Sequence, residues 1–554
     1  MPKFQDEKSQ QKVNALRKRE EEEVTKMLAD RYGVAYVDLA VFPIEIDALK
    51  TISEETSRAG EMAIVRATGK QLDIAVHKPD KPETITILDR LKADNYTYDL
   101  FLASVASLEH AWEFYKKVPA AHEMNIGAIQ ISFEKIAEMQ REVTSISQIN
   151  DRVQSTLTTR ASDALEVILG GALAIDASDI HIEPQSDAIR LRYRLDGVLY
   201  DIAPIPRKLF NLLLSRIKLV SEIKINIHDA AQDGRFTIKT KPIDIEVRTS
   251  TLPGPNGENI VLRILNPKAI DVQFDQLGMQ PWVAQAMQKE MNRPNGMILT
   301  TGPTGSGKTT TLYTFLRTVY NPTIKVITLE DPIEYHLSGI EQTQVDSEKG
   351  YDFANGLRSI VRQDPDIILV GEIRDLETAE IAMHASLTGH LVFSTLHTND
   401  AAGTIPRLID LGVKPNIIAP AMNVAMAQRL VRKLCAQCKK QQLLGDEQKK
   451  SITAEFAHFP KTVAIPPESE WKTFAATAAG CDTCNHTGYK GRIGIFELIF
   501  INEAIEQIIL TSPSEYDIKK ASVEQGQITM RQDGILKVLA GITDYEEYER
   551  VVGV

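Results

Sequence analysis

The residues with the clearest chemistry lie in a glycine-rich segment near the middle of the chain. Residues 302–309 read Gly-Pro-Thr-Gly-Ser-Gly-Lys-Thr and fit the phosphate-binding loop pattern, Gly-x-x-x-x-Gly-Lys-Ser/Thr. The apolar residues 297–299 predict a buried strand before the loop, and residues 309–319 predict a helix after it. A chance glycine-rich turn is the alternative, but this strand and helix count against it. We therefore interpret the segment as a nucleoside triphosphate site.

The composition of this loop follows from what phosphate requires. Glycines let consecutive backbone N–H groups turn toward phosphate oxygens, and the following helix presents its positive end to the same anion. Lys308 can reach the β- and γ-phosphates, and the Thr309 hydroxyl can ligate Mg²⁺, so ATP and Mg²⁺ are the predicted cofactors. The predicted nucleotide-binding residues are Gly302, Pro303, Thr304, Gly305, Ser306, Gly307, Lys308, Thr309 and Thr310.

Acidic residues end a second predicted strand. Residues 326–334 read Val-Ile-Thr-Leu-Glu-Asp-Pro-Ile-Glu. In a parallel sheet the carboxyl ends of the strands lie at the edge where ligands bind, so Glu330 or Asp331 could orient and activate water there. For Asp331 the alternative is a helix N-cap ahead of Pro332.

Two further strand ends carry polar residues. Residues 366–372 place Glu372 after four apolar residues, the Walker B pattern, and Glu372 is expected to hold Mg²⁺ through water because that ion keeps most of its hydration shell. Residues 391–398 predict another strand, with His397 at its end and His390 just before its start. Both histidines are candidate sensors of the γ-phosphate, and a structural role is the alternative for each.

The four cysteines form two Cys-x-x-Cys pairs, Cys435 with Cys438 and Cys481 with Cys484. This pattern predicts a zinc site, although 42 residues separate the pairs instead of the usual ~15–20. Four thiolates give a closed tetrahedral shell, which is structural and not catalytic. Free or redox-active thiols are the alternative, and the nearby His486 is not needed as a ligand.

Composition narrows the class of protein. The chain has 554 residues, of which 43% are hydrophobic and 25% charged, and no apolar run approaches the ~18–20 residues that span a bilayer. Residues 3–26 are too charged for a secretory signal, so we expect a cytoplasmic protein with at most peripheral membrane association. The net charge of -12 counts against broad binding to a nucleic-acid backbone.

The elements that must position these residues fall into several predicted domains. Four strand-like runs alternate with helical ones after about residue 275, which predicts an α/β core built on a parallel sheet. The predicted parts are a small α+β interaction domain at 1–118, a linker at 119–160, a second α+β domain at 161–270 and the ATPase domain at 275–554. The ATPase domain is expected to include a zinc-binding part at 432–490 and a helical segment at 500–554.

Arginines project from one face of the predicted sheet of the second domain. Arg248 lies in the alternating run 243–248 and Arg263 in the run 259–265, each opposite apolar residues that should be buried. These apolar residues are Ile243, Ile245, Val247, Ile260, Leu262 and Ile264. One interpretation is a solvated face or local ion pairs, and the other is that some arginines reach a phosphate across a subunit boundary. Arg194 and Arg235 are further candidates, although each could instead pair with the nearby Asp196 or Asp233, respectively.

Taken in order, these motifs resemble the secretion ATPase superfamily, in particular its type II secretion ATPases and type IV pilus assembly ATPases. The resemblance covers about residues 160–500. The matching blocks are residues 178–184, 194–197, 232–235, 250–253, 330–334, 371–375, 388–390 and 394–399.

The resemblance implies a RecA-like ATPase core preceded by a PAS-like domain. It further implies a homohexamer that hydrolyses ATP at subunit boundaries and drives pilin or pseudopilin assembly through a polytopic cytoplasmic-membrane platform protein. A membrane-associated assembly protein is expected to contact the N-terminal domain. Arg248 and Arg263 are expected to reach the γ-phosphate, and Glu330 is favoured over Glu372 as the residue that activates water. The four cysteines favour an assembly motor over a retraction motor, and the sequence leaves pilus assembly and type II secretion both open.

Two departures from the family pattern limit what is carried over. Only residues 29–33 resemble the long repeat that binds a cyclic dinucleotide in some relatives, so that ligand is not expected here. Residues 228–231 read His-Asp-Ala-Ala where relatives tend to carry a basic residue and a proline. A nucleic-acid translocase on a similar core is a rival reading, opposed by the net acidity, and a small-molecule kinase would need neither extra domains nor a zinc site.

Overall fold

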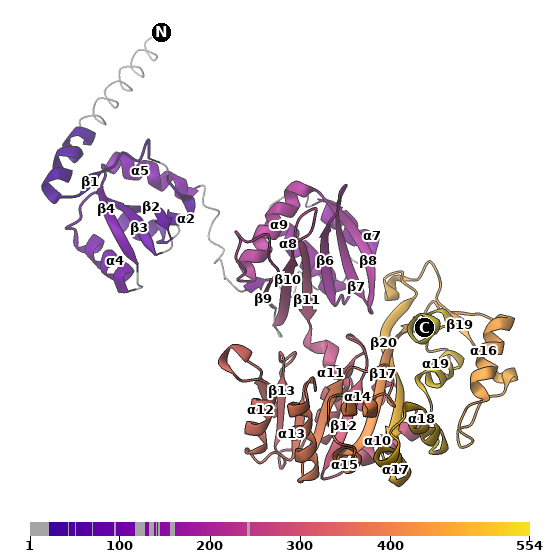
Figure 1. Cartoon of the computed structure of the whole chain (residues 1–554). Helices are drawn as coiled ribbons and strands as arrows, with labels where there is room; N and C mark the ends of the chain where they lie inside the picture. Colours follow the sequence, from indigo (N-terminus) through magenta and orange to yellow (C-terminus); the bar gives the residue numbers. More distant parts are fainter. Residues whose placement is uncertain are drawn as a thin grey trace. The chain divides into compact units, whose positions relative to one another are not determined.

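The computed structural model describes residues 21–42, 44–49, 51–68, 70–93, 96–116, 128–131, 138–139, 141, 145–155, 161–240 and 244–553. The chain divides into two compact units, residues 1–124 and residues 125–554, and each is described by itself (Figure 1). Ile243, most of the expected linker at 119–160 and the first residues of the charged N-terminus lie outside the described residues. Among the described residues no helix is both long enough and apolar enough to span a bilayer.

The first unit is built on a mixed sheet of four strands in the order β1-β4-β3-β2. The strands are β1 (Ala35–Tyr36), β2 (Met62–Thr68), β3 (Gln71–Val76) and β4 (Thr97–Leu102). The helices are α2 (Ile46–Leu49), α3 (Glu54–Ala59), α4 (Pro82–Ala93) and α5 (Val105–Glu113), and residues 21–32 are also helical. Two separate apolar clusters pack against this sheet, since alternate side chains of its strands point to opposite faces.

The second unit begins with a seven-stranded sheet in the order β5-β9-β10-β11-β6-β7-β8. Its strands are β5 (Ala128–Gln130), β6 (Asp179–Pro184), β7 (Ile189–Leu195), β8 (Val198–Ile205), β9 (Gln232–Lys239), β10 (Ile245–Leu252) and β11 (Asn259–Leu265). The helices α7 (Ile146–Ser155), α8 (Ala161–Ala174) and α9 (Arg207–Val220) share one buried core with the apolar face of this sheet. Ile245, Val247, Ile260, Leu262 and Ile264 are buried in it, as the alternation predicts.

Part of this sheet was not anticipated from the sequence. β5 and α7 lie within the stretch expected to be a linker, yet β5 pairs with β9 and α7 contributes to the core. β8 and β9 complete the sheet at positions where no strand was predicted. β8 contains Asp201 and Pro204, and β9 starts at the turn-like residues Asp233 and Gly234, so neither has a clean alternating pattern.

A second seven-stranded sheet, in the order β14-β13-β15-β16-β12-β17-β20, carries the predicted chemistry. All neighbouring pairs are parallel except the last, in which β17 and β20 are antiparallel. The strands are β12 (Gly296–Thr301), β13 (Val326–Glu330), β14 (Glu341–Gln344), β15 (Ile367–Val370), β16 (Leu391–Leu396), β17 (Met422–Leu434) and β20 (Tyr489–Phe500). β12 is an inner strand of this sheet: β16 ends level with it beside the loop that follows, and β17 continues past that loop.

Helices and buried apolar side chains cover both faces of this sheet. The helices on one side include α10 (Pro281–Met291) and α11 (Lys308–Val319). Those on the other include α12 (Phe353–Val361), α13 (Leu376–Leu387), α14 (Thr404–Asp410) and α15 (Pro415–Ala421). A mostly parallel sheet with helices on both faces is a doubly wound α/β fold, whose ligand edge is formed by the carboxyl ends of the strands. The α/β class predicted from the sequence is confirmed.

The remainder of the chain packs at the β20 edge of the sheet (Figure 1). It includes the short pair β18 (Lys440–Gln441) and β19 (Phe474–Ala475), and α16 (Asp446–Phe456). The chain ends in four helices, α17 (Glu503–Thr511), α18 (Glu515–Glu524), α19 (Met530–Leu539) and α20 (Tyr545–Val552), so the predicted helical C-terminus is confirmed.

Candidate active site and metal centre

The phosphate-binding loop joins β12 to α11 and lies against β17. Gly302, Gly305 and Gly307 have φ angles of 145°, 81° and 89°, which favour glycine. A Cβ atom on Gly302 would lie 2.6 Å from the Gln428 carbonyl oxygen, and one on Gly307 would lie 2.8 Å from the Gln428 side-chain nitrogen. Two of the loop glycines are therefore required by the close approach of β17 as well as by their backbone conformation.

Lys308 is the first residue of α11 and folds back over the loop. Its Nζ donates to the carbonyl oxygens of Gly302 at 2.7 Å and Pro303 at 3.2 Å. Burial lowers the pKa of Lys308, while the carboxylate of Glu372 raises it in part. An ammonium held beside the glycine-rich loop fits the charge of a nucleotide phosphate.

Glu372 lies just beyond β15, at the same edge of the sheet. Its carboxylate accepts a hydrogen bond from Nη2 of Arg374 and lies 3.4 Å from Nε2 of His397, which follows β16. The structure therefore brings Lys308, Glu372 and His397 together at the carboxyl ends of three neighbouring strands, as the parallel sheet requires. This arrangement can bind phosphate and polarise a bound water.

Glu330 ends β13 but has a different environment. Its side chain is buried, and its carboxylate accepts hydrogen bonds from Tyr313 Oη, from Thr328 Oγ1 at 2.6 Å and from Gln342 Nε2 at 3.1 Å. Burial raises the pKa of Tyr313, and the neighbouring Glu330 raises it further, so the phenol stays a proton donor. Two of these donors share Oε1 and only Tyr313 bonds Oε2, so Oε2 keeps an acceptor position that a water could use. No helix begins at the exposed Asp331, so its predicted alternative as an N-cap is wrong.

His390 cannot act at this site. It precedes the first residue of β16, whereas the loop lies beyond the carboxyl end of the neighbouring β12, and the two strands are parallel. The six residues of β16 separate its first end, beside His390, from its carboxyl end, beside the loop, by roughly 20 Å. His390 Nδ1 instead lies 2.9 Å from the Ala385 carbonyl oxygen at the end of α13. The structural alternative is the correct one for this histidine.

The arginines of the first sheet of this unit form a row. The strand register places Arg235 opposite Arg248, Arg248 opposite Arg263, Arg263 opposite Asp179, and Asp179 opposite Arg194. Cross-strand neighbours share one face, so four guanidinium groups and one carboxylate line up across five strands. Positive groups therefore outnumber negative ones in this row, although the whole chain is acidic.

The members of this row have different partners. Arg248 Nη2 donates to the carbonyl oxygen of Ile333, in the loop after Glu330, at 2.6 Å. Arg263 Nε lies 3.1 Å from Asp179 and is half exposed. Arg194 also pairs with Asp179, at 3.3 Å, so the predicted pairing of Arg194 with Asp196 is wrong.

The two Cys-x-x-Cys pairs are far apart in the sequence, but their four sulfur atoms lie close together. The Sγ atoms of Cys435 and Cys481 lie 3.7 Å apart, and those of Cys438 and Cys484 lie 3.8 Å apart. A disulfide needs sulfurs about 2.0 Å apart, whereas a zinc ion about 2.3 Å from four tetrahedral sulfurs places them about 3.8 Å apart. The backbone N–H groups of Cys481 and Gly488 donate to Cys484 Sγ at 3.2 and 3.3 Å, which suits a thiolate. The cluster fits a structural zinc site.

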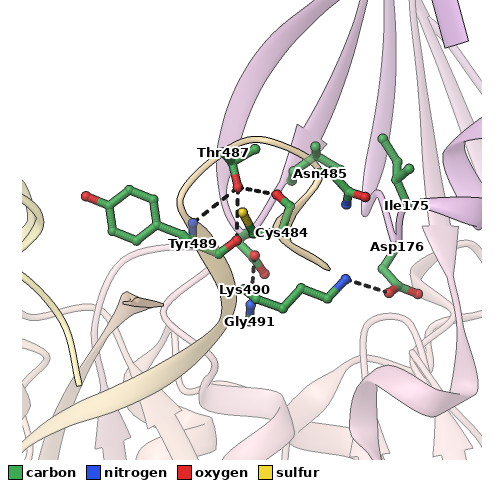
Figure 2. Close-up of a pocket in the computed structure, with 10 residues that line it drawn as sticks. Ile175, Asp176, Cys484, Asn485, Thr487, Tyr489, Lys490 and Gly491 are labelled. Carbon is green, nitrogen blue, oxygen red and sulfur yellow. Dashed lines mark hydrogen bonds and ion pairs between the residues drawn. The ribbon is translucent and has the colours of Figure 1, made fainter. Parts of the chain in front are cut away.

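A small cavity of about 120 Å³ lies beside this cluster, between the turn after β7 and the loop after Cys484 (Figure 2). Lys490 reaches Asp176 at 3.5 Å, and the Gly491 N–H donates to Asp196 at 2.9 Å. Its lining residues are Ile175, Asp176, Leu195, Asp196, Cys484, Asn485, Thr487, Tyr489, Lys490 and Gly491. The cysteine region thus contacts the first sheet of this unit and stands apart from the phosphate-binding loop.

Several residues at the site were not identified from the sequence. Arg374 lies in the quoted block at 371–375, and its position two residues after Glu372 was the available signal. Tyr313 becomes relevant only when α11 packs on β13, and Gln428 and Arg429 only when β17 lies beside β12. No local pattern marks these three.

The chain is similar to proteins of known families. The family described as "Type II/IV secretion system protein" matches residues 131–550. The type IV pilus assembly ATPase PilB of Myxococcus xanthus is 35% identical over 532 residues, which cover 95% of this chain and 90% of that protein. The type II secretion system protein E of Pseudomonas aeruginosa is 44% identical over 387 residues, covering 70% of this chain and 74% of that protein.

Solved structures share the fold. The crystal structure of the Legionella pneumophila ATPase DotB superposes with a TM-score of 0.50 at 21% sequence identity, covering 70% of this chain and 94% of that one. At this level of identity the likeness concerns the fold alone.

Proposed function

The chain belongs to the family of type II/IV secretion system proteins and is an ATP hydrolase, and we propose that it is the homohexameric motor of type IV pilus assembly. The observation that carries this choice is the extent of similarity. The match to the type IV pilus assembly ATPase covers 95% of the chain and so includes most of the first unit, whereas the match to the type II secretion protein covers 70%. The second candidate is a type II secretion ATPase, favoured by the higher identity of 44% within the shared part.

Nucleotide binding is assigned to the loop between β12 and α11. Its inward N–H groups and the Lys308 ammonium bind the β- and γ-phosphates, and the start of α11 adds a positive dipole end. The Thr309 hydroxyl and, through water, the Glu372 carboxylate are the oxygen donors that would hold Mg²⁺. When bound, that ion neutralises charge on the β- and γ-phosphates.

Water activation is assigned to Glu330. Its carboxylate receives three hydrogen bonds from within the protein, so an incoming water uses the remaining acceptor position on Oε2 or displaces one of the donors. Gln342 is the donor most easily displaced because its bond is the longest and it also donates to the Tyr335 carbonyl oxygen. Glu372 and His397 then face the γ-phosphate from the neighbouring strands.

The arginine row supplies cations to the γ-phosphate of a neighbouring subunit. Arg248 and Arg263 are the leading candidates, and in the present conformation Arg248 is bonded to a carbonyl of its own chain. To act on a phosphate, Arg248 must give up this hydrogen bond and donate to a phosphate oxygen of the neighbouring subunit's nucleotide. An arginine supplied in this way is worth roughly 10³–10⁵ in turnover in other phosphoryl-transfer systems.

The proposed setting is the cytoplasmic face of the cytoplasmic membrane. The partners in this setting are a polytopic platform protein and a membrane-associated assembly protein that contacts the first unit. No nucleic acid and no cyclic dinucleotide is assigned.

The test replaces the chromosomal gene by a Lys308→Ala version in the source bacterium. Electron microscopy then counts surface pili, and assays of the culture medium measure secreted enzymes. We expect pili to disappear while secretion continues, and re-expression of the wild-type chain to restore them. Loss of secretion with pili intact would assign the chain to type II secretion instead.

A separate measurement addresses the nucleic-acid alternative. ATP turnover of the purified chain is compared with and without DNA at several salt concentrations. We expect no change, because the chain is acidic overall. Strong stimulation by DNA together with salt-sensitive binding would overturn the motor assignment.

A further inference from the structure

β17 extends past the end of β12 and braces the phosphate-binding loop. The last aligned pair of these strands is Thr301 with Ala427, so Gln428 and Arg429 lie level with the loop itself. A Cβ on Gly302 would lie 2.6 Å from the Gln428 carbonyl oxygen and 3.1 Å from Arg429 Nη1. The Gln428 side chain also accepts a hydrogen bond from Thr311 Oγ1 of α11 at 2.8 Å, so β17 contacts both ends of the loop.

The Arg429 guanidinium joins this brace to a second loop. Nη1 donates to the Gln428 carbonyl oxygen at 3.0 Å, and Nη2 donates to the Asn399 carbonyl oxygen at 2.9 Å. At the start of the phosphate-binding loop, Thr301 Oγ1 at the end of β12 accepts a hydrogen bond from the Thr398 N–H at 2.7 Å. Residues 397–401, which follow β16, are thereby attached to both β12 and β17 at the base of the loop.

This second loop carries one of the polar groups of the site. Its first residue is His397, whose ring lies 3.4 Å from Glu372. Its far end is fixed from the C-terminal part of the chain, since Lys519 pairs with Asp400 at 2.7 Å and Glu497 accepts from the Ala401 N–H at 2.9 Å. The Arg429 bond to Asn399 links these anchors to the phosphate-binding loop, in addition to the bond between Thr301 and Thr398.

The charge of Arg429 also acts on the site. Burial lowers its pKa, the carboxylates of Glu497 and Asp400 raise it, and the guanidinium in turn lowers the pKa of Lys308. Arg429 therefore adds a second positive charge near Lys308. A planar guanidinium can bond two carbonyls at fixed angles, which a lysine ammonium cannot reproduce.

We propose that Arg429 is a positioning residue for ATP hydrolysis: it holds residues 397–401 against the base of the phosphate-binding loop, so that His397 and Glu372 meet the γ-phosphate in the geometry for reaction. This proposal rests on the proposed ATPase site. Because ADP has no γ-phosphate, loss of Arg429 should impair turnover while leaving ADP binding largely intact.

The test compares purified Arg429→Gln and Arg429→Lys with the wild type. Lys433→Gln is the matched control, because Lys433 is an exposed cation on the same strand. Steady-state ATP hydrolysis gives kcat and KM, a fluorescent ADP analogue gives Kd, and thermal unfolding reports folding. Lys308→Ala is measured alongside to establish that turnover depends on the proposed site.

We expect Arg429→Gln to lower kcat about 10- to 100-fold, in the range produced by misplacing a reacting group, with the ADP Kd within about threefold of wild type. Arg429→Lys, which keeps the charge, should recover part of the loss, and Lys433→Gln should match the wild type. An unchanged kcat in Arg429→Gln while Lys308→Ala is inactive would overturn the inference and leave the ATPase site standing. Equal losses of ADP binding and folding would also overturn it, because they mark a merely structural residue.

Discussion

Loss of one thiol from the cysteine cluster should unfold a defined part of the chain without emptying the nucleotide site. The variant is Cys438→Ser, and its matched control is Thr483→Ala, an exposed residue of the same region whose hydroxyl donates only to Gln437 among the described contacts. The Sγ atoms of Cys438 and Cys484 are 3.8 Å apart, so zinc bound by all four thiolates would cross-link the two ends of this region.

The magnitude follows from the length of the loop that the cross-link closes. Cys435 and Cys481 are 46 positions apart, and closing such a loop removes unfolded-state entropy worth about 4 kcal/mol at room temperature. Loss of the metal should lower the free energy of local unfolding by this order. The phosphate-binding loop belongs to β12 and α11, so nucleotide affinity should change little.

The assay combines elemental analysis, limited proteolysis between residues 439 and 480, and nucleotide binding. We expect one zinc per wild-type chain and per Thr483→Ala chain, less than stoichiometric zinc in Cys438→Ser, and faster cleavage of that variant alone. A zinc chelator should make the wild type behave like Cys438→Ser and should leave that variant unchanged. Wild-type protein without stoichiometric zinc, or equal cleavage of all three proteins, would refute the reasoning.

Three further outcomes are expected. Lys308→Ala should lower ATP turnover roughly 10²–10³-fold in a phosphate-release assay, because the transition state loses its main side-chain cation, and a rate near wild type would contradict this. Glu330→Gln should lower turnover at least about 100-fold with ATP still bound, and if Glu372→Gln alone were inactive the water-activating role would pass to Glu372. His181 stands beside Arg194, and burial followed by this cation lowers its pKa below 6.5, so the unfolded chain binds the proton more tightly than the folded one. The contribution of this group to the free energy of unfolding should be complete above pH 6.5 and should fall as the pH drops below it. Thermal unfolding measured against pH should therefore show a shallower loss of stability in His181→Asn than in the wild type. Identical pH profiles would exclude His181 as a cause of the pH dependence.

The parts of the site that are contiguous in sequence were predictable. The phosphate-binding loop, Glu372 with its strand, and the two cysteine pairs are local patterns whose chemistry fixes their spacing. The partner of Arg194 is different, because it follows from the pairing of β6 with β7, whose register places Arg194 opposite Asp179.

Other features depend on contacts that no short pattern encodes. β17 pairs with β12, more than one hundred residues earlier in the chain, and the position of Arg429 follows only from that placement. The buried environment of Glu330 could not be predicted either, because it depends on α11 placing Tyr313 within hydrogen-bond distance of the carboxylate. For His390 the structural alternative holds, because the parallel pairing of β12 and β16 places it at the end of the sheet away from the loop.

The proposal that each site is completed by a neighbouring subunit can be tested by mixing two inactive variants. Arg248→Ala subunits keep an intact nucleotide pocket, and Lys308→Ala subunits keep an intact arginine. In randomly mixed rings roughly a quarter of the subunit boundaries join an intact arginine to an intact pocket, since ring interfaces are head-to-tail. The account predicts that mixed rings regain ATP turnover of up to about this fraction, whereas each variant alone stays inactive. No recovery in rings shown to contain both variants would contradict it.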